Sequence, residues 1–282
     1  MKIADIHSSD LTAACLRAVQ LRHEGKIVAE YTSALYRGQL AGEVLRRVHE
    51  GRWAGDLSTA ILDAHKAVEA NAKAENRPIT QAVEKNRTDT WAEVQKAVEF
   101  YRERFREYFA RCKFIGCELP IRAEIDGRQF ASHLDLLFRD PEGQLCVWDW
   151  KWWQDSPTFA YLARNLQLAM YALSVRHGAV MLDDDWIEFG EWPRIAWVHL
   201  PNLMPYGRSG EWGKKGEHRP EEKIVRWLPA HSQWESKIRA EFALRGRMME
   251  EDLWPTNPDP VGCELCESRM YCQPFVQIGS EQ

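Results

Sequence analysis

Acidic and basic side chains occur together in two short, otherwise apolar segments near the middle of the chain. Asp135 lies in the first segment, and Asp149 and Lys151 lie two residues apart in the second. Residues two apart in a strand point to the same face, so Asp149 and Lys151 would project together and a hairpin would bring Asp135 alongside them. Two carboxylates from adjacent strands form an oxygen site suited to Mg²⁺ or Mn²⁺. With a lysine that orients water, such a site is suited to hydrolysing a phosphodiester.

A carboxylate two positions before a lysine is weak evidence by itself, because the chain has three further cases. These are Glu24 with Lys26, Glu221 with Lys223, and Glu235 with Lys237. The ordinary interpretation of such a pair is a solvated ion pair at the protein surface. Asp149 and Lys151 differ because their neighbours are apolar, and a charge buried among apolar side chains needs a partner or a metal.

A polar stripe follows on the next predicted helix. Arg164, Gln167 and Tyr171 are spaced by three and four residues, which places them on one helix face. A guanidinium, an amide and a phenol on one face can hold a phosphate or a base near the metal site. The alternative is an ordinary polar outer face.

Periodicity divides the chain into a helical part, a strand-rich part and a C-terminal part. Helical spacing dominates the first third, and Thr90 with Glu93 could form the capping box of its last helix. Turn signals at Asp126-Gly127 and at Asp140–Gly143 separate three β-rich segments and indicate an antiparallel meander. We expect helices at about 32–50, 57–76, 88–112, 158–175 and 232–249, and strands at about 118–125, 130–139, 145–152, 195–200 and 224–228. The three parts, 1–114, 115–200 and 201–282, are expected to form one integrated domain.

Length and composition exclude several classes of protein. The chain has 282 residues, of which 45% are hydrophobic, and a formal net charge of −5. These values exclude a disordered chain and a uniformly basic nucleic-acid coat. Since no apolar run approaches the ~18–20 residues that span a bilayer, and no secretory signal is evident, we expect no membrane association and a cytoplasmic location.

The C-terminal cysteines have the spacing of metal ligands. Cys263, Cys266 and Cys272 form a C-x2-C-x5-C cluster, and the total of seven cysteines is odd for a disulfide framework. Four cysteines would suit either zinc or a 4Fe–4S cluster, and ligand type alone does not choose between them. The rival candidates for a fourth ligand are better explained as packing residues; they are Cys112, Cys117 and Cys146.

Taken together, these motifs resemble those of the RecB-like PD-(D/E)XK nucleases. Asp135, the triplet that begins at Asp149, and Gln167 with Tyr171 follow the order of the family's motifs II, III and QxxxY. The C-terminal cysteines resemble the iron–sulfur pattern of the AddB-type nucleases, of the CRISPR-adaptation exonucleases and of their phage-encoded relatives. That subgroup has its fourth cysteine near the N-terminus, closely followed by an arginine, and Cys15 with Arg17 matches this pattern.

The resemblance implies an α/β protein with a restriction-endonuclease-like core, which is a mixed sheet flanked by helices, together with a helical N-terminal region and a cysteine-cluster C-terminus. It implies an exonuclease for linear, single-stranded DNA that uses Mg²⁺ or Mn²⁺. Asp135 and Asp149 would bind the metal, and Lys151 would position the water. The side chains implied for substrate binding are Gln167, Tyr171 and Arg164.

The same resemblance implies cofactors and partners. A 4Fe–4S cluster would join the two ends of the chain through Cys15, Cys263, Cys266 and Cys272. DNA would be the substrate, and a recombination or CRISPR-adaptation protein would be a partner. Some relatives form rings, so a homo-oligomer is a further expectation. The host would be bacterial, with a phage-encoded origin as one option.

One departure from the family pattern affects the metal site. The family places a metal-binding histidine four residues after a glycine in the second helix; counted from Gly38, that position is Gly42 here. Glu43 is a candidate replacement ligand. Glu118 is another, because it resembles an additional acidic position in some relatives. A missing ligand could also mean weakened or lost catalysis.

Two other interpretations are therefore open at the level of sequence. The chain could be a catalytically inactive iron–sulfur DNA-binding module in recombination or spacer capture, which Gly42 favours and the presence of Asp135, Asp149 and Lys151 disfavours. It could instead be a zinc-stabilised interaction protein. A colourless anaerobic preparation with stoichiometric zinc would indicate the latter.

Overall fold

The computed structural model describes residues 6–7, 19–20, 32–51, 53, 55–77, 79–152, 165–205, 216–228 and 231–251. The helices in these ranges are α3 (Ser33–Glu50), α4 (Leu57–Ala74), α5 (Gln81–Lys85), α6 (Arg87–Ala110), α8 (Leu166–His177), α9 (Glu221–Ile224) and α10 (Glu235–Glu250). Short 3₁₀ turns occur at Leu200–Leu203 and His231–Trp234. The strands are β1 (Ile6–His7), β2 (Lys113–Ile125), β3 (Arg128–Arg139), β4 (Leu145–Lys151), β5 (Ala179–Leu182), β6 (Asp185–Ile187), β7 (Arg194–His199) and β8 (Val225–Trp227). None of the described helices has the length and apolar character that crossing a membrane requires.

The helices predicted at 32–50, 57–76 and 88–112 are confirmed, and side-chain caps set the start of two of them. Thr32 precedes α3, and its hydroxyl accepts the Leu35 N–H at 3.3 Å. Asp56 precedes α4, and its carboxylate accepts the Thr59 N–H at 2.9 Å. Each cap satisfies one of the N–H groups that the first helical turn leaves without an intrahelical partner.

The capping box predicted for α6 is wrong. The helix begins at Arg87, directly after Asn86, so Thr90 lies inside it and is only 2% exposed. The predicted apolar stripe of the same helix is confirmed, and its buried members include Val94 and Tyr101. A threonine that points into the core cannot serve the amides of the first turn.

The described strands form one mixed sheet in the order β6–β5–β2–β3–β4–β7–β8, with β1 pairing with β3 outside this path. β2, β3 and β4 run antiparallel, as their turn signals predict. β4 and β7 run parallel, and α8 lies between them in the chain. The predicted mixed sheet flanked by helices is therefore confirmed.

The hairpin of β5 and β6 has no counterpart in the sequence-based prediction. Its strands have only four and three residues. Its two-residue turn consists of Asp183 and Asp184, which have φ of 50° and 69°. Positive φ at both turn residues suits the right-handed twist of a hairpin, but glycine or asparagine usually provides it. Two aspartates are a weak signal for this turn.

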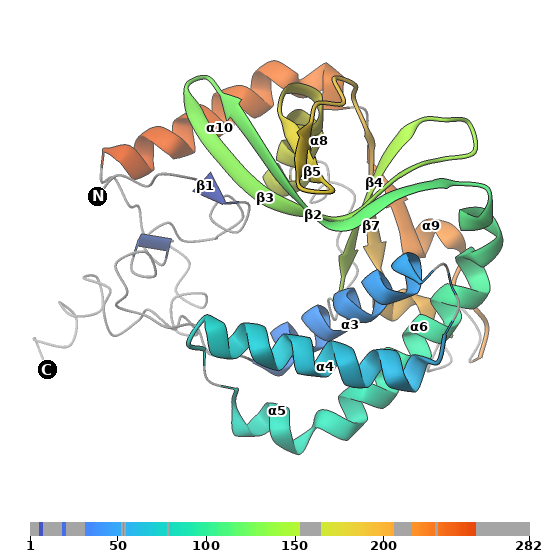
Figure 1. The fold of residues 1–282 in the computed structure, drawn as a ribbon. Coiled ribbons are helices and arrows are strands. Elements are labelled where there is room, and N and C mark those ends of the chain that lie inside the picture. Colours follow the sequence, from blue (N-terminus) through green and yellow to red (C-terminus); the bar gives the residue numbers. More distant parts are fainter. Residues whose placement is uncertain are drawn as a thin grey trace, which may run out of the picture.

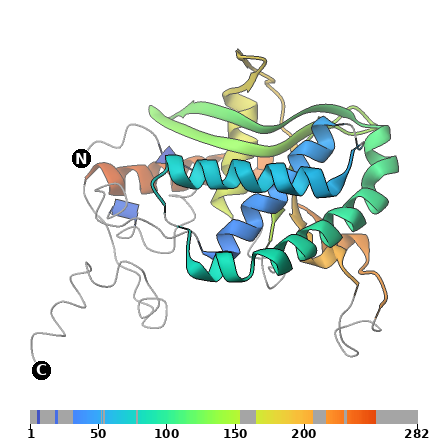
Figure 2. The same ribbon diagram turned by 60° about the horizontal axis from the view of Figure 1, so that its bottom comes forward.

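Helices cover both faces of the sheet and create two apolar cores (Figures 1 and 2). α3, α4 and α6 pack on one face, where Trp148 and Trp150 of β4 are buried. α8 and α10 pack on the other face, where Val147 of β4 and Trp197 of β7 are buried. Because residues of a strand alternate between faces, Asp149 and Lys151 belong to the α8 side.

His49 of α3 is a buried polar residue of the α3-side core. It is 3% exposed, and its Nε2 atom lies 2.9 Å from the Tyr101 hydroxyl oxygen. Its ring lies within 6.0 Å, between ring centroids, of four other aromatic side chains, which are Trp53, Phe109, Phe114 and Trp150. Burial lowers the pKa of His49 to about 3. The ring is therefore neutral in the folded protein at neutral pH.

The neutral His49 is expected to make the fold sensitive to acid. An unfolded histidine takes up a proton near pH 6.5, whereas the folded one does not until about pH 3, so stability from this residue is complete above pH 6.5 and falls as the pH drops. Relative to His49→Gln, the wild type should lose about 2 kcal/mol of unfolding free energy between pH 7.5 and pH 5. Urea titrations of both proteins at the two pH values measure this difference. A difference that does not change with pH would contradict a neutral, buried imidazole.

Candidate functional site

The two long strands β2 and β3 reverse their pleat at the residues Glu118 and Asp135. In β2, Cys117 packs in the α3-side core but Ile121 packs in the α8-side core, although both positions are odd-numbered. Glu118 has φ of 49°, a left-handed conformation that interrupts the regular alternation of side chains. In β3, Leu134 and Leu136 likewise enter opposite cores. The two carboxylates thus lie at an irregular point of the sheet.

A second irregularity lies between β3 and β4. Their pairing runs from Arg139 opposite Leu145 to Leu136 opposite Trp148, next to Asp135 and Asp149. Beyond it, the Trp150 N–H donates to Asp135 Oδ2 at 2.7 Å. The Asp135 carboxylate therefore accepts the hydrogen bond that a backbone carbonyl of the neighbouring strand accepts in a regular sheet. This bond fixes Asp135 next to the strand that carries Asp149 and Lys151.

Asp149 and Lys151 form a close ion pair on the α8 side of the sheet. The Lys151 ammonium donates to Asp149 Oδ1 at 2.8 Å. Asp149 has no exposed surface, whereas the Lys151 side chain is 22% exposed. The structure thus brings together Asp135, Asp149 and Lys151, which the sequence motifs single out. Their catalytic roles are predictions.

Burial and mutual repulsion shift the acidic groups of this site. Burial and the neighbouring Asp135 raise the pKa of Asp149 to about 7, although Lys151 opposes the shift. Burial also raises the pKa of Asp135. Glu118 is exposed to solvent. Partial burial of its carboxylate and the nearby carboxylates of Asp135 and Glu43 nevertheless raise its pKa to about 8. A cluster of acids with raised pKa values would be stabilised by an added positive charge.

Lys151 is held in its charged form. Burial alone would lower its pKa, but the carboxylates of Asp149 and Asp135 outweigh burial and raise the pKa above the usual value for lysine. A lysine that keeps its proton cannot remove one from water. Its contribution at this site is positive charge and hydrogen-bond donation.

Helix α8 brings the predicted substrate-binding pair to the same place. The Gln167 amide donates to the Tyr171 hydroxyl at 2.7 Å. Tyr171 is 2% exposed, and burial, Asp149 and Asp135 raise its pKa to about 12. Its phenol is therefore neutral and lies under Gln167, which is the more exposed of the two. Arg164, the third residue of the predicted stripe, lies outside the described residues.

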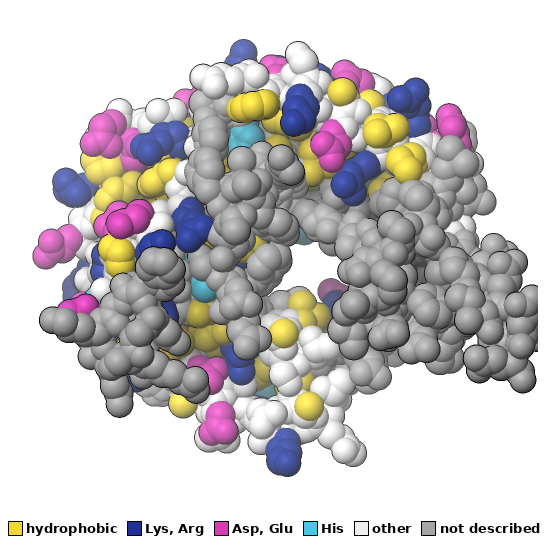
Figure 3. All heavy atoms as spheres, turned by 180° about the vertical axis from the view of Figure 1, so that it is seen from behind, with side chains coloured by type: hydrophobic (Ala, Val, Ile, Leu, Met, Phe, Trp, Pro, Cys, Tyr) yellow, Lys and Arg dark blue, Asp and Glu magenta, His cyan; other side chains and the backbone are white. Residues whose placement is uncertain are grey.

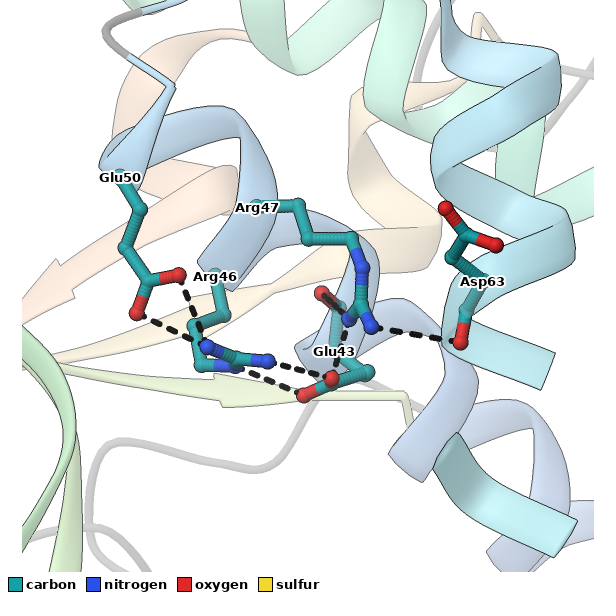
Figure 4. A network of polar contacts seen from close by, with 5 residues as sticks. All are labelled: Glu43, Arg46, Arg47, Glu50 and Asp63. Carbon is teal, nitrogen blue, oxygen red and sulfur yellow. Dashed lines mark hydrogen bonds and ion pairs between the residues drawn. The ribbon is translucent and has the colours of Figure 1, made fainter. Parts of the chain in front are cut away.

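Helix α3 borders the site at the position where the family pattern has histidine. A Cβ atom added to Gly42 would lie 3.7 Å from Glu118 Oε1. The carboxylate of Glu43, the candidate replacement ligand, faces two arginines instead. It accepts hydrogen bonds from the guanidinium groups of Arg46 and Arg47 (Figure 4). These bonds outweigh the effect of burial, so the pKa of Glu43 lies below its usual value.

A divalent cation fits the donor set of the site. Asp149 Oδ2 is buried and has no hydrogen-bond partner within the described part of the chain, which is costly for a carboxylate oxygen. Among those residues, no three acidic, histidine or cysteine side chains are grouped closely enough to hold an ion alone. Mg²⁺ at phosphate-processing sites needs only one or two carboxylates, with water and substrate phosphate completing its shell. Asp135 and Asp149 would meet that need.

The cysteine ligands predicted for a cluster, Cys15, Cys263, Cys266 and Cys272, all lie outside the described residues. The three remaining cysteines are free thiols. Burial raises the pKa of Cys146 to about 12 and that of Cys112 to about 11, and it raises the pKa of Cys117 further. Since a thiolate is the metal-binding form, these thiols are poor ligands.

The sequence motifs did not identify two features of the site. Arg46 lies next to the acidic cluster, and its spacing from Glu43 and Glu50 is the signal that could have indicated an ion-pair network. The Trp150 amide that holds Asp135 has no sequence signal, because every non-proline residue carries the same N–H group.

Comparisons with known proteins agree with the geometry. A family model described as "PD-(D/E)XK nuclease superfamily" matches residues 8–273. No curated protein matches the chain. A solved structure described as "Crystal structure of SSO0001" is 11% identical, with 98% of this chain and 88% of that chain covered and a TM-score of 0.41. This similarity is too low to indicate a shared function.

Proposed function

Since the chain belongs to the PD-(D/E)XK nuclease superfamily, we propose that it is a metal-dependent deoxyribonuclease that digests linear, single-stranded DNA from its ends. The observation that carries the proposal is the arrangement of Asp135, Asp149 and Lys151. One acid is fixed by a backbone N–H at 2.7 Å, and the other pairs with the lysine at 2.8 Å while keeping one oxygen free of hydrogen bonds within the described residues. An ordinary surface ion pair would leave both side chains in contact with water, whereas Asp149 is fully buried.

The proposed roles follow from the charges of the side chains. Asp135 and Asp149 would hold Mg²⁺ or Mn²⁺, which supplies positive charge at the phosphate and makes water more acidic when it is bound. Lys151 stays cationic, so it would orient the attacking water and stabilise negative charge on the phosphate. Gln167 would contact the DNA backbone, held in place by Tyr171. Glu118 is a further candidate metal ligand beside Asp135.

The exonuclease part of the proposal depends on the similarity of the motifs to RecB-like exonucleases. It is tested with end-labelled linear and closed circular single-stranded DNA, protein prepared without oxygen, and Mg²⁺ or Mn²⁺. We expect degradation of linear DNA and survival of circles. Loss of circles as well would indicate an endonuclease. Binding without cleavage with either metal would favour the inactive DNA-binding module, for which Gly42 in the histidine position is the motivating observation.

The described ends of the chain lie close enough to support a shared 4Fe–4S cluster. β1 pairs with Phe130 and Ala131 at the start of β3. At the end of α10, Glu250 forms an ion pair with Arg128, 2.8 Å between Oε2 and Nη2. Cys15 follows β1 by eight residues and Cys263 follows Glu250 by thirteen. At up to ~3.5 Å per residue, both cysteines can reach one point near these positions.

The cluster is expected to give a visible signature. Protein purified without oxygen should be brown and contain iron, whereas a zinc site would be colourless. Cys266→Ala should lose the colour and most of the iron. Cys112→Ala is the matched control, because this thiol keeps its proton and is expected to leave the colour unchanged. Metal analysis and visible absorption measure both outcomes, and a colourless wild type with one zinc per chain would contradict the cluster.

A further inference from the structure

One face of α3 runs from the catalytic carboxylates to an arginine that has no assigned role. Gly42, Arg46 and Glu50 follow each other at intervals of four residues, so they share a helix face. That face meets the site at Gly42, which lies against Glu118. One turn further on, Arg46 is close enough to lower the pKa of Glu118 electrostatically. Arg46 therefore lies next to the acidic cluster along α3.

The guanidinium of Arg46 is held differently on its two sides (Figure 4). On one side, the Glu43 carboxylate accepts two parallel hydrogen bonds, from Arg46 Nε at 2.9 Å and from Arg46 Nη2 at 2.6 Å. The Glu43 side chain is only 17% exposed. Glu50 receives bonds from a single nitrogen, Nη1, and its side chain is 44% exposed. A bidentate, half-buried pair gives a fixed geometry, whereas an exposed pair contributes little and exchanges readily with other anions.

The neighbouring arginine provides a contrast within the same network. Arg47 also binds the Glu43 carboxylate, but its Nη2 donates to the backbone carbonyl of Asp63 in α4 at 3.2 Å. A second bond from its Nη1 reaches the Glu43 carbonyl at 3.2 Å. The bond to Asp63 ties α3 to α4, so Arg47 has a structural role. Within the described residues, Arg46 makes no such link between helices, and one of its partners, Glu50, is a carboxylate that another anion can replace.

We propose that Arg46 contacts a phosphate of the DNA strand beside the cleavage site and that Glu43 positions its guanidinium. This inference rests on the proposed nuclease function and adds a substrate contact to it. Without the metal, the acidic cluster opposes the binding of a polyanion, and Lys151 is already paired with Asp149. A second cation next to the cluster would offset this repulsion and help to hold the strand. Figure 3 shows acidic and basic side chains intermingled on the described surface of one face of the molecule. A phosphate offers Arg46 the same paired oxygens as Glu50.

Salt dependence of DNA binding tests the proposal without cleavage. A fluorescein-labelled thymidine 30-mer is titrated by anisotropy without divalent metal, at several KCl concentrations. Each phosphate contact on single-stranded DNA contributes about 0.7 to the slope of log K against log salt. Arg46→Gln should reduce the slope by about this amount and weaken binding several-fold. Arg46→Lys keeps the charge, so it should retain most of the slope while losing affinity.

Two further variants separate a DNA contact from a structural role. Glu50→Gln removes the competing anion, so it should tighten binding about two- to threefold, and the gain should vanish in the double variant Arg46→Gln, Glu50→Gln. Arg47→Gln should lower the melting temperature and leave the salt slope unchanged. Wild-type slope and affinity in Arg46→Gln, or no gain in Glu50→Gln, would overturn the inference while leaving the nuclease intact. Absence of DNA binding by the wild type would overturn this inference, and only the absence of cleavage in the nuclease assay as well would overturn the proposed function.

Discussion

Replacing Lys151 by methionine is expected to reduce DNA cleavage about 10³-fold in a protein that still folds. The change removes the positive charge that orients water and stabilises the phosphate, an effect of about 10²–10³-fold or more at comparable sites. It also leaves Asp149 buried without its cation, since the two groups are 2.8 Å apart and Asp149 has no exposed surface. An unpaired buried carboxylate takes up a proton and becomes a poorer ligand.

The chain contains a matched control for this variant. Glu235 and Lys237 have the same spacing as Asp149 and Lys151, but Lys237 is exposed on α10. Lys237→Met should leave cleavage unchanged. The double variant Lys151→Met, Asp149→Asn should recover stability relative to Lys151→Met without recovering cleavage, because it removes the unpaired charge. Initial rates on labelled linear DNA and melting temperatures measure these outcomes. Wild-type cleavage by Lys151→Met would contradict the assignment of the site.

Gly178→Ala is expected to destabilise the protein by about 3 kcal/mol or more. Gly178 ends α8 where the helix meets β2, and an added Cβ atom would lie 2.1 Å from the Arg122 carbonyl oxygen. That oxygen belongs to a strand paired on both sides, so it cannot move away easily. The clash would also displace α8, which carries Gln167 and Tyr171, so cleavage should fall together with stability.

Gly38→Ala is the control for this effect. Gly38 lies inside α3, and an added Cβ atom there would meet no atom within 4 Å. Alanine is the better helix former, so this variant should be up to ~1 kcal/mol more stable than the wild type. Urea titrations of the two variants should move the unfolding midpoint in opposite directions. Equal shifts of the two midpoints would contradict the close contact between Gly178 and the Arg122 carbonyl.

Much of the secondary structure is encoded in local patterns. The helical spacing of apolar residues placed α3, α4 and α6 within a few residues of their observed ends. Turn signals likewise placed β2, β3 and β4 in an antiparallel meander. Local patterns were insufficient where an element is short or held by partners distant in sequence. β1 has two residues and exists because it pairs with β3, and the β5–β6 turn uses aspartates with positive φ.

Residue types and their spacing already define the available chemical groups: two carboxylates and a lysine at strand spacing, a Gln–Tyr pair at helix spacing, and cysteines at metal-ligand spacing. How the strand and helix groups meet depends on the three-dimensional fold. The pleat reversal at Glu118, the Trp150 N–H on Asp135 and the capture of Glu43 by two arginines all depend on contacts between distant segments. Side-chain type and spacing are local properties of the chain. Packing decides which carboxylate oxygen has no hydrogen-bond partner among the described residues and which accepts bonds from a neighbour, and packing follows from the whole fold.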